Sequence, residues 1–261
     1  MQNAGIAELG LNWRYLACEV DPANLREALT GAKLMGFVGV NLTVPHKLLA
    51  VDIVDVLDDS ARAWGAVNTV RFETENGKTT ARGFNTDADA ITRSIREDLG
   101  IEIRGAKVLL LGAGGAGRTA ALKLASEGVR ELNLVNRTES KAAAVAKEIV
   151  ERNPQVKVRV GYPSTPVDLL LNATSLGLKP DDAMPVEIHQ FSLPQAGGVY
   201  DMIYRPAETP LLKTAKAAGC RTANGLGMLL YQGAKALEIW TGKPAPVEVM
   251  RRALRENVYG H

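Results

Sequence analysis

A glycine-rich segment, Gly112–Gly117, lies between a predicted strand at Lys107–Leu111 and a predicted helix. In a dinucleotide-binding βαβ unit, the first glycine permits a tight turn and the second lets the backbone approach a pyrophosphate, while the last lets helix and strand pack closely. The start of the helix offers unpaired N–H groups to the anion. The surrounding strand and helix therefore predict a dinucleotide site, which the glycines alone would indicate only weakly.

The second strand of this unit, predicted at Glu131–Val135, indicates which dinucleotide binds. A carboxylate at the end of this strand would hold a free ribose 2′-hydroxyl. The sequence has Asn136, Arg137 and Thr138 there instead, and a guanidinium and a hydroxyl match a 2′-phosphate in charge and geometry. We therefore expect the cofactor to be NADP(H). The alternative is a glycine-rich turn followed by an incidental arginine.

Lys47 is a candidate for proton transfer. The segment Gly39–Lys47 runs from the end of a predicted strand into the start of a predicted helix, with Pro45 suited to the first helical position. A cation in the first turn opposes the helix macrodipole, and the positive helix end favours the neutral form of a lysine, which helps it to exchange protons. A solvated surface lysine is the alternative interpretation.

Asp87 is the candidate partner of this lysine. It stands just before a predicted helix, so the simplest interpretation is that Asp87 or Thr86 caps that helix. A carboxylate and a lysine at the starts of two helices would make a better acid–base unit, because the carboxylate can hold and orient the ammonium.

The composition points to a small-molecule partner. The net charge is only +2, and no basic run is interleaved with aromatic residues, which argues against nucleic acid and against an anionic membrane as partners. We see neither a membrane-spanning window nor a secretion signal. Cys18 and Cys220 match no zinc or disulfide spacing, so we expect two buried thiols in a reducing, cytoplasmic compartment. The histidines, His46, His189 and His261, are scattered, and no metal site is expected.

The order of the predicted elements indicates two α/β domains. The first would have a mixed sheet, with strands at Trp13–Val20, Phe37–Leu42, Ala66–Phe72 and Thr79–Phe84 and helices at Ala23–Met35 and Pro45–Leu57. A helix at Asp87–Leu99 leads to the nucleotide unit, whose later strands lie near Val156–Val160, Val167–Leu171 and Val199–Ile203. Helices at Leu226–Trp240 and from Pro246 onward then return to the first domain.

Seven ordered motifs across nearly the whole chain carry a family resemblance. They are Asn-Leu-Thr-Val-Pro-His-Lys at 41–47, Gly-Ala-Val-Asn-Thr at 65–69, Gly-Phe-Asn-Thr-Asp at 83–87, the glycine-rich turn with Asn-Arg-Thr at 136–138, Asn-Ala-Thr-Ser at 172–175, Tyr-Asp-Met-Ile-Tyr at 200–204 and Gly-Leu-Gly-Met-Leu at 225–229. In this order they resemble the shikimate dehydrogenases. The resemblance implies NADP-dependent interconversion of 3-dehydroshikimate and shikimate, in the chorismate pathway to aromatic amino acids.

The resemblance also implies the roles of residues and domains. Residues 1–86 and 225–261 would form a small substrate-binding and catalytic α/β domain, and residues 87–224 a Rossmann-like, doubly wound NADP-binding domain. Lys47 and Asp87 would be the catalytic pair, and the substrate would contact Thr43, Lys47, Asn68, Asp87, Tyr204 and Gln232. The cofactor would contact Gly112, Ala113, Gly114, Gly115, Ala116, Asn136, Arg137, Thr138, Met202 and Gly225. Alternatively, Thr43 and Asn68 cap their own turns, and Gln232 is a core amide bonded to backbone.

The sequence departs from the family pattern at three places. The family usually begins with another strand and a Ser-x-Ser-Pro loop that binds the substrate carboxylate, whereas this sequence starts just after that loop. We expect the neighbours of that strand to have unpaired backbone groups. Ala88, Asp89 and Ala90 stand where glycines are common, which should alter the helix entry, and Asn224 stands where an aspartate is frequent.

Two alternatives to a shikimate dehydrogenase stay open. One is a quinate or quinate/shikimate dehydrogenase. The other is a non-catalytic homologue that binds NADP(H) or a shikimate-like ligand and signals by domain closure. Lys47 and Asp87 favour the enzyme, and the missing serine loop favours the binding module. The substrate is the only partner expected, and a homodimer is left open.

Overall fold

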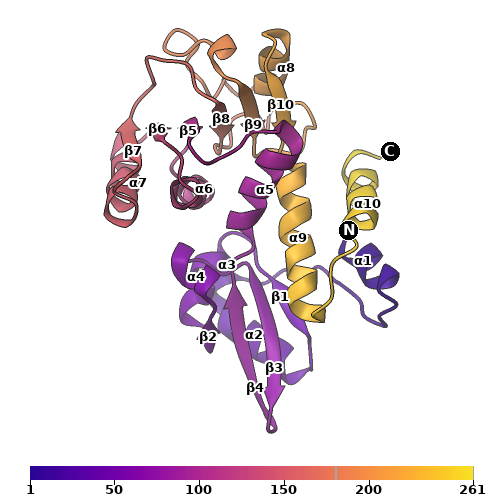
Figure 1. The fold of residues 1–261 in the computed structure, drawn as a ribbon. Helices are drawn as coiled ribbons and strands as arrows, with labels where there is room; N and C mark the ends of the chain where they lie inside the picture. The colour runs from indigo at the N-terminus through magenta and orange to yellow at the C-terminus, as the bar shows by residue number, and fades with distance from the viewer. Residues whose placement is uncertain (180, 261) are drawn as a thin grey trace. The chain divides into compact units, whose positions relative to one another are not determined.

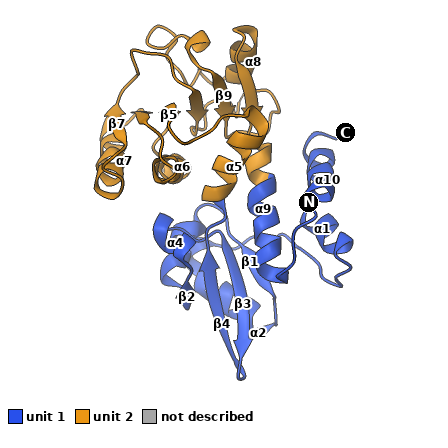
Figure 2. Cartoon of the chain, viewed as in Figure 1, with its two compact units in different colours: residues 1–87, 230–261 blue, residues 88–229 orange. Residues whose placement is uncertain are grey.

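The computed structural model describes residues 1–179 and 181–260 and divides into two compact units (Figure 1, Figure 2). Unit 1 comprises residues 1–87 and 230–261, and unit 2 comprises residues 88–229. His261, which we did not expect to belong to a metal site, lies outside the described residues. The α/β fold class predicted from the sequence is confirmed.

Unit 2 is built around a six-stranded, entirely parallel sheet with the order β10-β9-β8-β5-β6-β7. Its strands are β5 (Lys107–Leu111), β6 (Glu131–Val135), β7 (Lys157–Val160), β8 (Leu169–Asn172), β9 (Gly198–Asp201) and β10 (Arg221–Asn224). From β5, the chain adds β6 and then β7 on one side of the sheet. It then returns to the other side of β5, where it adds β8, β9 and β10 in turn. This is the doubly wound Rossmann order, in which ligands bind where the direction reverses, beyond the carboxyl ends of the strands.

The helices of unit 2 follow its strands. They are α5 (Asp87–Leu99, whose first residue belongs to unit 1), α6 (Gly115–Ser126), α7 (Glu139–Arg152) and α8 (Pro210–Ala217), with a short 3-10 turn at Leu193–Gln195. Strands β5 and β6 begin and end at the residues predicted for them, and α5 covers the predicted range, so Asp87 is its first residue and does not stand before it as a cap. Leu109 and Leu170, in the two central strands, are completely buried, as expected for a parallel sheet covered on both faces.

Unit 1 contains a four-stranded sheet with the order β1-β3-β4-β2. Its strands are β1 (Gly39–Asn41), β2 (Val56–Leu57), β3 (Thr69–Glu75) and β4 (Lys78–Phe84). The pairings β1–β3 and β3–β4 are antiparallel, whereas β2–β4 is parallel, so the predicted mixed sheet is confirmed. The buried core of this sheet consists of Leu25, Leu29, Ala50, Ala61, Val67, Val70 and Ala81.

Helices from both ends of the chain complete unit 1. They are α1 (Gln2–Glu8), α2 (Leu25–Leu34), α3 (His46–Leu49), α4 (Asp59–Trp64), the later part of α9 (Leu226–Thr241) and α10 (Val247–Tyr259), with 3-10 turns at Pro22–Asn24 and Ala50–Asp52. The indole Nε1 of Trp240 donates to the carbonyl of Val70 in β3 at 3.0 Å. The amide of Gln2 donates to the carbonyl of Gly233 at 2.9 Å. The C-terminal helices therefore return to the first domain, as predicted.

The strand predicted at Trp13–Val20 is wrong, because this segment has no regular structure. The side chain of Asn3 forms hydrogen bonds with both backbone groups of Tyr15. Its Oδ1 accepts from the N–H of Tyr15 at 2.8 Å, and its Nδ2 donates to the carbonyl of Tyr15 at 3.0 Å. Tyr15 therefore has no backbone groups left for a strand partner. Cys18 lies in the same segment and is exposed, which corrects the expectation of a buried thiol there; Cys220 is half-buried.

The helix predicted at Pro45–Leu57 is also wrong beyond its first turn. Helix α3 ends at Leu49, and after a 3-10 turn the chain forms β2. Long-range bonds to β4 override the local helical pattern: the N–H of Asp55 donates to the carbonyl of Ala81 at 2.9 Å, and the Asp55 carboxylate accepts from the N–H of Ala81 at 2.7 Å.

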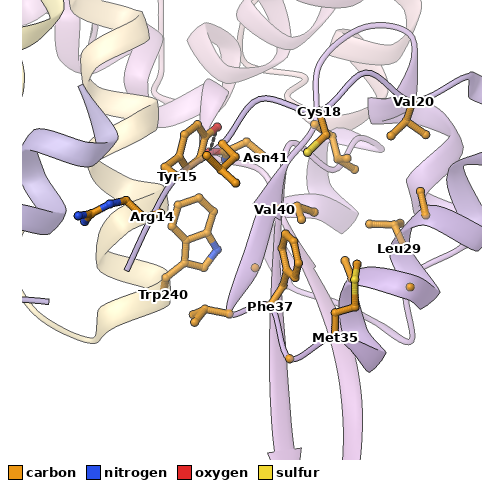
Figure 3. Close-up of a pocket in the computed structure, with 18 of the residues that line it drawn as sticks. Arg14, Tyr15, Cys18, Val20, Leu29, Met35, Phe37, Val40, Asn41 and Trp240 are labelled. Carbon is orange, nitrogen blue, oxygen red and sulfur yellow. Dashed lines mark hydrogen bonds between the residues drawn. The ribbon is translucent and has the colours of Figure 1, made fainter. Parts of the chain in front are cut away.

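An apolar cavity of about 630 Å³ lies alongside β1, one of the two edge strands of this sheet (Figure 3). Its walls come from α2, from β1 and from the irregular segment that contains Tyr15, and Trp240 closes one side.

In the described part of the chain, no helix is long and apolar enough to cross a membrane.

Close packing at Gly39 gives a test of unit 1. A Cβ at this position would overlap the indole Nε1 of Trp240 and the carbonyl of Val70, so Gly39→Ala should lower the free energy of unfolding by about 1–3 kcal/mol. The matched control is Gly31→Ala in α2, where a Cβ meets no atom within 4 Å and alanine favours the helix. Urea unfolding measures both. If the two variants had equal free energies of unfolding, the close packing described at Gly39 would be contradicted.

Candidate active site

Lys47 and Asp87 form an ion pair in unit 1. The Nζ of Lys47 lies 2.7 Å from Oδ2 of Asp87. The Asp87 side chain is 13% exposed and that of Lys47 is 27% exposed, so the pair is shielded on most sides yet reachable from solvent. The structure therefore brings together the two residues that the sequence identified as an acid–base unit.

The amide of Asn68 holds the other oxygen of this carboxylate. Its Nδ2 donates to Oδ1 of Asp87 at 2.9 Å and to Oγ1 of Thr86 at 2.9 Å, and its Oδ1 accepts from the N–H of Thr86 at 2.9 Å. Asn68 is 1% exposed. Two different side chains thus fix the two oxygens of Asp87, and the carboxylate is held in one orientation.

Lys47 is held in position by the segment just before β3 rather than by a long helix. Helix α3 has only four residues, so the macrodipole that we expected to act on Lys47 is small. The backbone carbonyl of Lys47 accepts from the N–H of Val67 at 2.8 Å, which ties the lysine to the segment just before β3. The ammonium is therefore governed mainly by the Asp87 carboxylate.

Helix α5, which begins at Asp87, is anchored to α6 within unit 2. The Nζ of Lys123 lies 2.6 Å from Oδ1 of Asp89 and 3.0 Å from Oε1 of Glu127. Arg96 also pairs with Glu127, at 2.6 Å. Asp89 is one of the three residues that stand where glycines are common in the family pattern, and its ion pair with Lys123 gives this departure a structural role.

The other substrate residues suggested by the resemblance are divided between the units. Thr43 is exposed and Gln232 is half-buried on α9, both in unit 1 with Lys47. Tyr204 is 37% exposed and belongs to unit 2.

The glycine-rich turn of unit 2 contains glycines of two kinds. Gly112 has a φ of +101°, and a Cβ at Gly117 would overlap the carbonyl of Gly112, so both are required by the fold. Gly114 and Gly115 are exposed, and a Cβ on either would meet no protein atom within 4 Å. The fold itself does not require these two, and an open backbone at the start of the twelve-residue helix α6 fits the approach of a pyrophosphate.

Asn136 braces this turn from the end of β6. Its Oδ1 accepts from the N–H of Ala113 at 2.9 Å, and its Nδ2 donates to the carbonyl of Thr138 at 2.8 Å. Arg137 and Thr138 are exposed, and no described residue forms an ion pair or hydrogen bond with the Arg137 guanidinium. The structure thus gives Asn136 a scaffolding role and leaves Arg137 available to an anion.

Met202 and Gly225 lie next to each other beyond the carboxyl ends of β9 and β10. A Cβ at Gly225 would overlap the carbonyl of Met202, so only glycine allows this approach. The side-chain Oδ1 of Asn224 accepts from the N–H of Leu226 at 3.0 Å, and its Nδ2 donates to the carbonyl of Ala207 at 2.7 Å. An aspartate, which is frequent here in the family pattern, could not make the second bond.

Asp201 organises the loop that carries Met202. Its completely buried carboxylate accepts from Oγ1 of Thr209 at 2.6 Å, from Nδ2 of Asn172 at 3.0 Å and from the N–H of Ile203 at 3.1 Å. Burial raises the pKa of the Asp201 carboxyl above its usual range, and these three bonds oppose the shift. Sequence reasoning did not assign Thr209 to this cluster, although a threonine before Pro210 is a typical helix start.

Within residues 1–179 and 181–260, no group of three or more His, Cys, Asp or Glu side chains is placed to hold a metal ion.

Comparison with known families matches three parts of the chain. Residues 1–70 match the shikimate dehydrogenase substrate binding domain, residues 94–160 match the shikimate / quinate 5-dehydrogenase family, and residues 225–255 match the shikimate 5'-dehydrogenase C-terminal domain.

Relatives resemble the chain over almost its whole length. A shikimate dehydrogenase (NADP(+)) of Methanopyrus kandleri is 43% identical, over 99% of this chain and 90% of the relative. The ligand-free 5-ketofructose reductase of a Gluconobacter species is 39% identical, with a TM-score of 0.85 over 99% of this chain and 92% of that one. Shikimate dehydrogenase of Thermus thermophilus, solved with NADP(H) and shikimate, is 34% identical, with a TM-score of 0.83 over 97% and 92% of the two chains.

The buried Asp201 makes stability depend on pH. Because its pKa is raised, the folded state keeps the proton to a higher pH than the unfolded state does. This contribution to stability is complete below the unfolded pKa of about 3.9 and is lost as the pH rises through the folded-state pKa. Asp201→Asn carries no charge at any pH, so its free energy of unfolding should fall less than that of the wild type as the pH rises through the folded-state pKa of Asp201. Urea unfolding at several pH values tests this. If the difference in the free energy of unfolding between the wild type and Asp201→Asn did not change with pH, the proposed effect of Asp201 on stability would be contradicted.

Proposed function

Because this chain belongs to the shikimate dehydrogenase family, we propose that it interconverts 3-dehydroshikimate and shikimate with NADP(H), using Lys47 and Asp87 as the catalytic pair. It is an NADP-dependent oxidoreductase. The observation that carries the assignment of the catalytic residues is the 2.7 Å ion pair between Nζ of Lys47 and Oδ2 of Asp87, with Asn68 on the second carboxylate oxygen. We assign cofactor binding to unit 2, and most of the proposed substrate residues belong to unit 1.

The residues of unit 2 fit NADP(H). Gly114 and Gly115 leave the start of α6 open to the pyrophosphate, and the exposed Arg137 and Thr138 suit the 2′-phosphate. When bound, NADPH supplies a hydride to the ketone carbon of the substrate, and NADP+ accepts one from the alcohol in the reverse direction.

The residues of unit 1 supply the proton. As the ketone is reduced, the Lys47 ammonium donates a proton to the ketone oxygen, which becomes the hydroxyl of shikimate. The Asp87 carboxylate keeps the ammonium aimed at that oxygen. In the oxidation direction, neutral Lys47 accepts the hydroxyl proton. Thr43, Asn68, Gln232 and Tyr204 are proposed to bind the substrate hydroxyls, and Asn68 also holds Asp87.

We also propose that the protein works in a reducing compartment such as the cytoplasm, because Cys18 and Cys220 are both free thiols.

The substrate is tested by steady-state assays of NADP+ reduction with shikimate and with quinate, and of NADPH oxidation with 5-ketofructose, the compound in the name of the Gluconobacter relative. We expect the highest kcat/KM with shikimate. A higher kcat/KM with either other compound would overturn the substrate assignment. NADPH binding without turnover of any of the three would indicate a binding module instead of an enzyme.

The catalytic pair is tested by replacing each member. Lys47→Ala should lose most of the turnover, on the order of a hundredfold or more, while NADPH affinity stays nearly unchanged, because Lys47 transfers a proton at the substrate. Asp87→Asn should lose a similar amount, and the double variant should be no worse than either single one. The control is Lys33→Ala, which breaks the 2.9 Å ion pair with Asp55 in the same unit and should keep full turnover. Turnover of Lys47→Ala within a few fold of the wild type would refute the role.

The preference for NADPH is tested at Arg137. Arg137→Ala should weaken NADPH binding by about 1.5–3 kcal/mol, which is the strength of a charge-assisted hydrogen bond, and should leave NADH binding almost unchanged. Titration calorimetry measures both cofactors. The control is Lys213→Ala, which removes an exposed cation from α8 of the same unit. Equal losses of NADPH and NADH affinity in Arg137→Ala would show that Arg137 does not bind the 2′-phosphate.

A further inference from the structure

A series of hydrogen bonds in unit 1 leads from Tyr15 to the Asp87 carboxylate. The hydroxyl of Tyr15 lies 3.1 Å from Oδ1 of Asn41, and Figure 3 shows this bond at the wall of the cavity. Nδ2 of Asn41 lies 3.0 Å from Oγ1 of Thr69, which lies 3.1 Å from Oδ1 of Asn68. Nδ2 of Asn68 then reaches Oδ1 of Asp87 at 2.9 Å. The two residues at the ends of this series of four bonds, Tyr15 and Asp87, are 72 positions apart in the sequence.

The orientation of the Asn68 amide is fixed by the backbone. The N–H of Thr86 can only donate, and it lies 2.9 Å from Oδ1 of Asn68. The oxygen of the amide therefore faces Thr86 and Thr69, and its nitrogen faces Asp87. It follows that the hydroxyl proton of Thr69 is donated to Asn68.

The orientation of the Asn41 amide is fixed in the same way. Its Nδ2 lies 3.2 Å from the backbone carbonyl of Asn68, which can only accept. The amide oxygen therefore faces the hydroxyl of Tyr15, which donates to it. Every donor in the series points toward Asp87. In such a chain each bond polarises the next, and the negative charge of the carboxylate is the favoured end point.

We propose that Tyr15, Asn41 and Thr69 are positioning residues for the reaction proposed above, acting through Asn68 to hold Asp87, and with it Lys47, in one orientation. The proposal rests on the proposed function of the Lys47–Asp87 pair. None of the three residues was assigned a role by the sequence or by the comparisons.

Burial makes the middle of this series costly to break. Thr69 is completely buried and Asn68 is 1% exposed, so water cannot replace a lost partner. Without the Thr69 hydroxyl, Oδ1 of Asn68 would keep the N–H of Thr86 as its main donor, so the amide would be held from one direction fewer and could shift. A shift of the Asn68 amide would also move the Asp87 carboxylate that it holds.

Burial raises the pKa of the Tyr15 hydroxyl above its usual range. Its ring also packs near the indole of Trp240, with 6.1 Å between the ring centroids. The replacement Tyr15→Phe therefore removes the first donor while keeping the packing.

The test begins at Thr69, where valine keeps the shape and removes the hydroxyl. Thr69→Val should lower kcat by about five- to thirtyfold, with the KM for NADP+ within twofold of the wild type. Thr69→Ser keeps the hydroxyl and should restore kcat to within about twofold. The matched control is Thr80→Val in β4 of the same sheet, whose hydroxyl makes only a 3.4 Å contact with the carbonyl of Glu73 and should leave kcat unchanged. Tyr15→Phe, at the far end, should lose less than Thr69→Val.

A lower melting temperature of Thr69→Val with kcat equal to that of Thr69→Ser would overturn the proposal, because Thr69 would then be purely structural. So would a loss in Thr80→Val as large as that in Thr69→Val.

A second readout does not depend on turnover. The side-chain amide resonance of Asn68, assigned with Asn68→Ala, should move in Thr69→Val and stay in place in Thr69→Ser and Thr80→Val. If the wild type turns over no substrate but this resonance behaves as expected, the proposed function fails and the hydrogen-bond series stands. If turnover is present but the resonance is the same in Thr69→Val and the wild type, the positioning proposal fails.

Discussion

The carboxylate of Asp87 is the point on which the polar interior of unit 1 converges. One oxygen holds the ammonium of Lys47 at 2.7 Å, and the other accepts from the buried amide of Asn68 at 2.9 Å. Burying a carboxylate that has two hydrogen-bond donors costs less free energy than burying an unpaired one. The two donors together set the orientation of the Asp87 carboxylate. Helix α3 supplies the ammonium, the residue just before β3 supplies the amide, and the first residue of α5 supplies the carboxylate, so three separate segments of unit 1 meet at one ion pair.

Unit 2 meets a different physical requirement, since a pyrophosphate needs bare backbone and not side chains. Gly112 and Gly117 close the turn on the protein side, whereas Gly114 and Gly115 leave open space on the solvent side. Asn136 connects this turn to the loop that carries Arg137, so one amide links the two regions proposed for the pyrophosphate and the 2′-phosphate. The doubly wound strand order brings these loops to the place where it reverses.

The sequence predicted the elements whose local pattern agrees with their packing. The apolar strand β5 and the helix α5, with Ile91 and Ile95 on one buried face, were placed to the residue. Prediction failed where a distant residue decides the local structure, as the side chain of Asn3 does at Tyr15 and the backbone of Ala81 does at Asp55. The same limit applies to the site. Lys47 and Asp87 stand out by residue type and motif, but no local pattern reveals that Tyr15 and Thr69 connect to them through hydrogen bonds.

The central claim is that the Lys47–Asp87 pair exchanges the proton of the substrate, and a crystal structure with shikimate and NADP+ bound tests it most directly. We expect one shikimate hydroxyl to lie within about 3.2 Å of Nζ of Lys47, while the Asp87 carboxylate still holds that ammonium. A structure in which shikimate is bound and turnover-competent, but in which no hydroxyl lies within hydrogen-bond reach of Lys47, would contradict it.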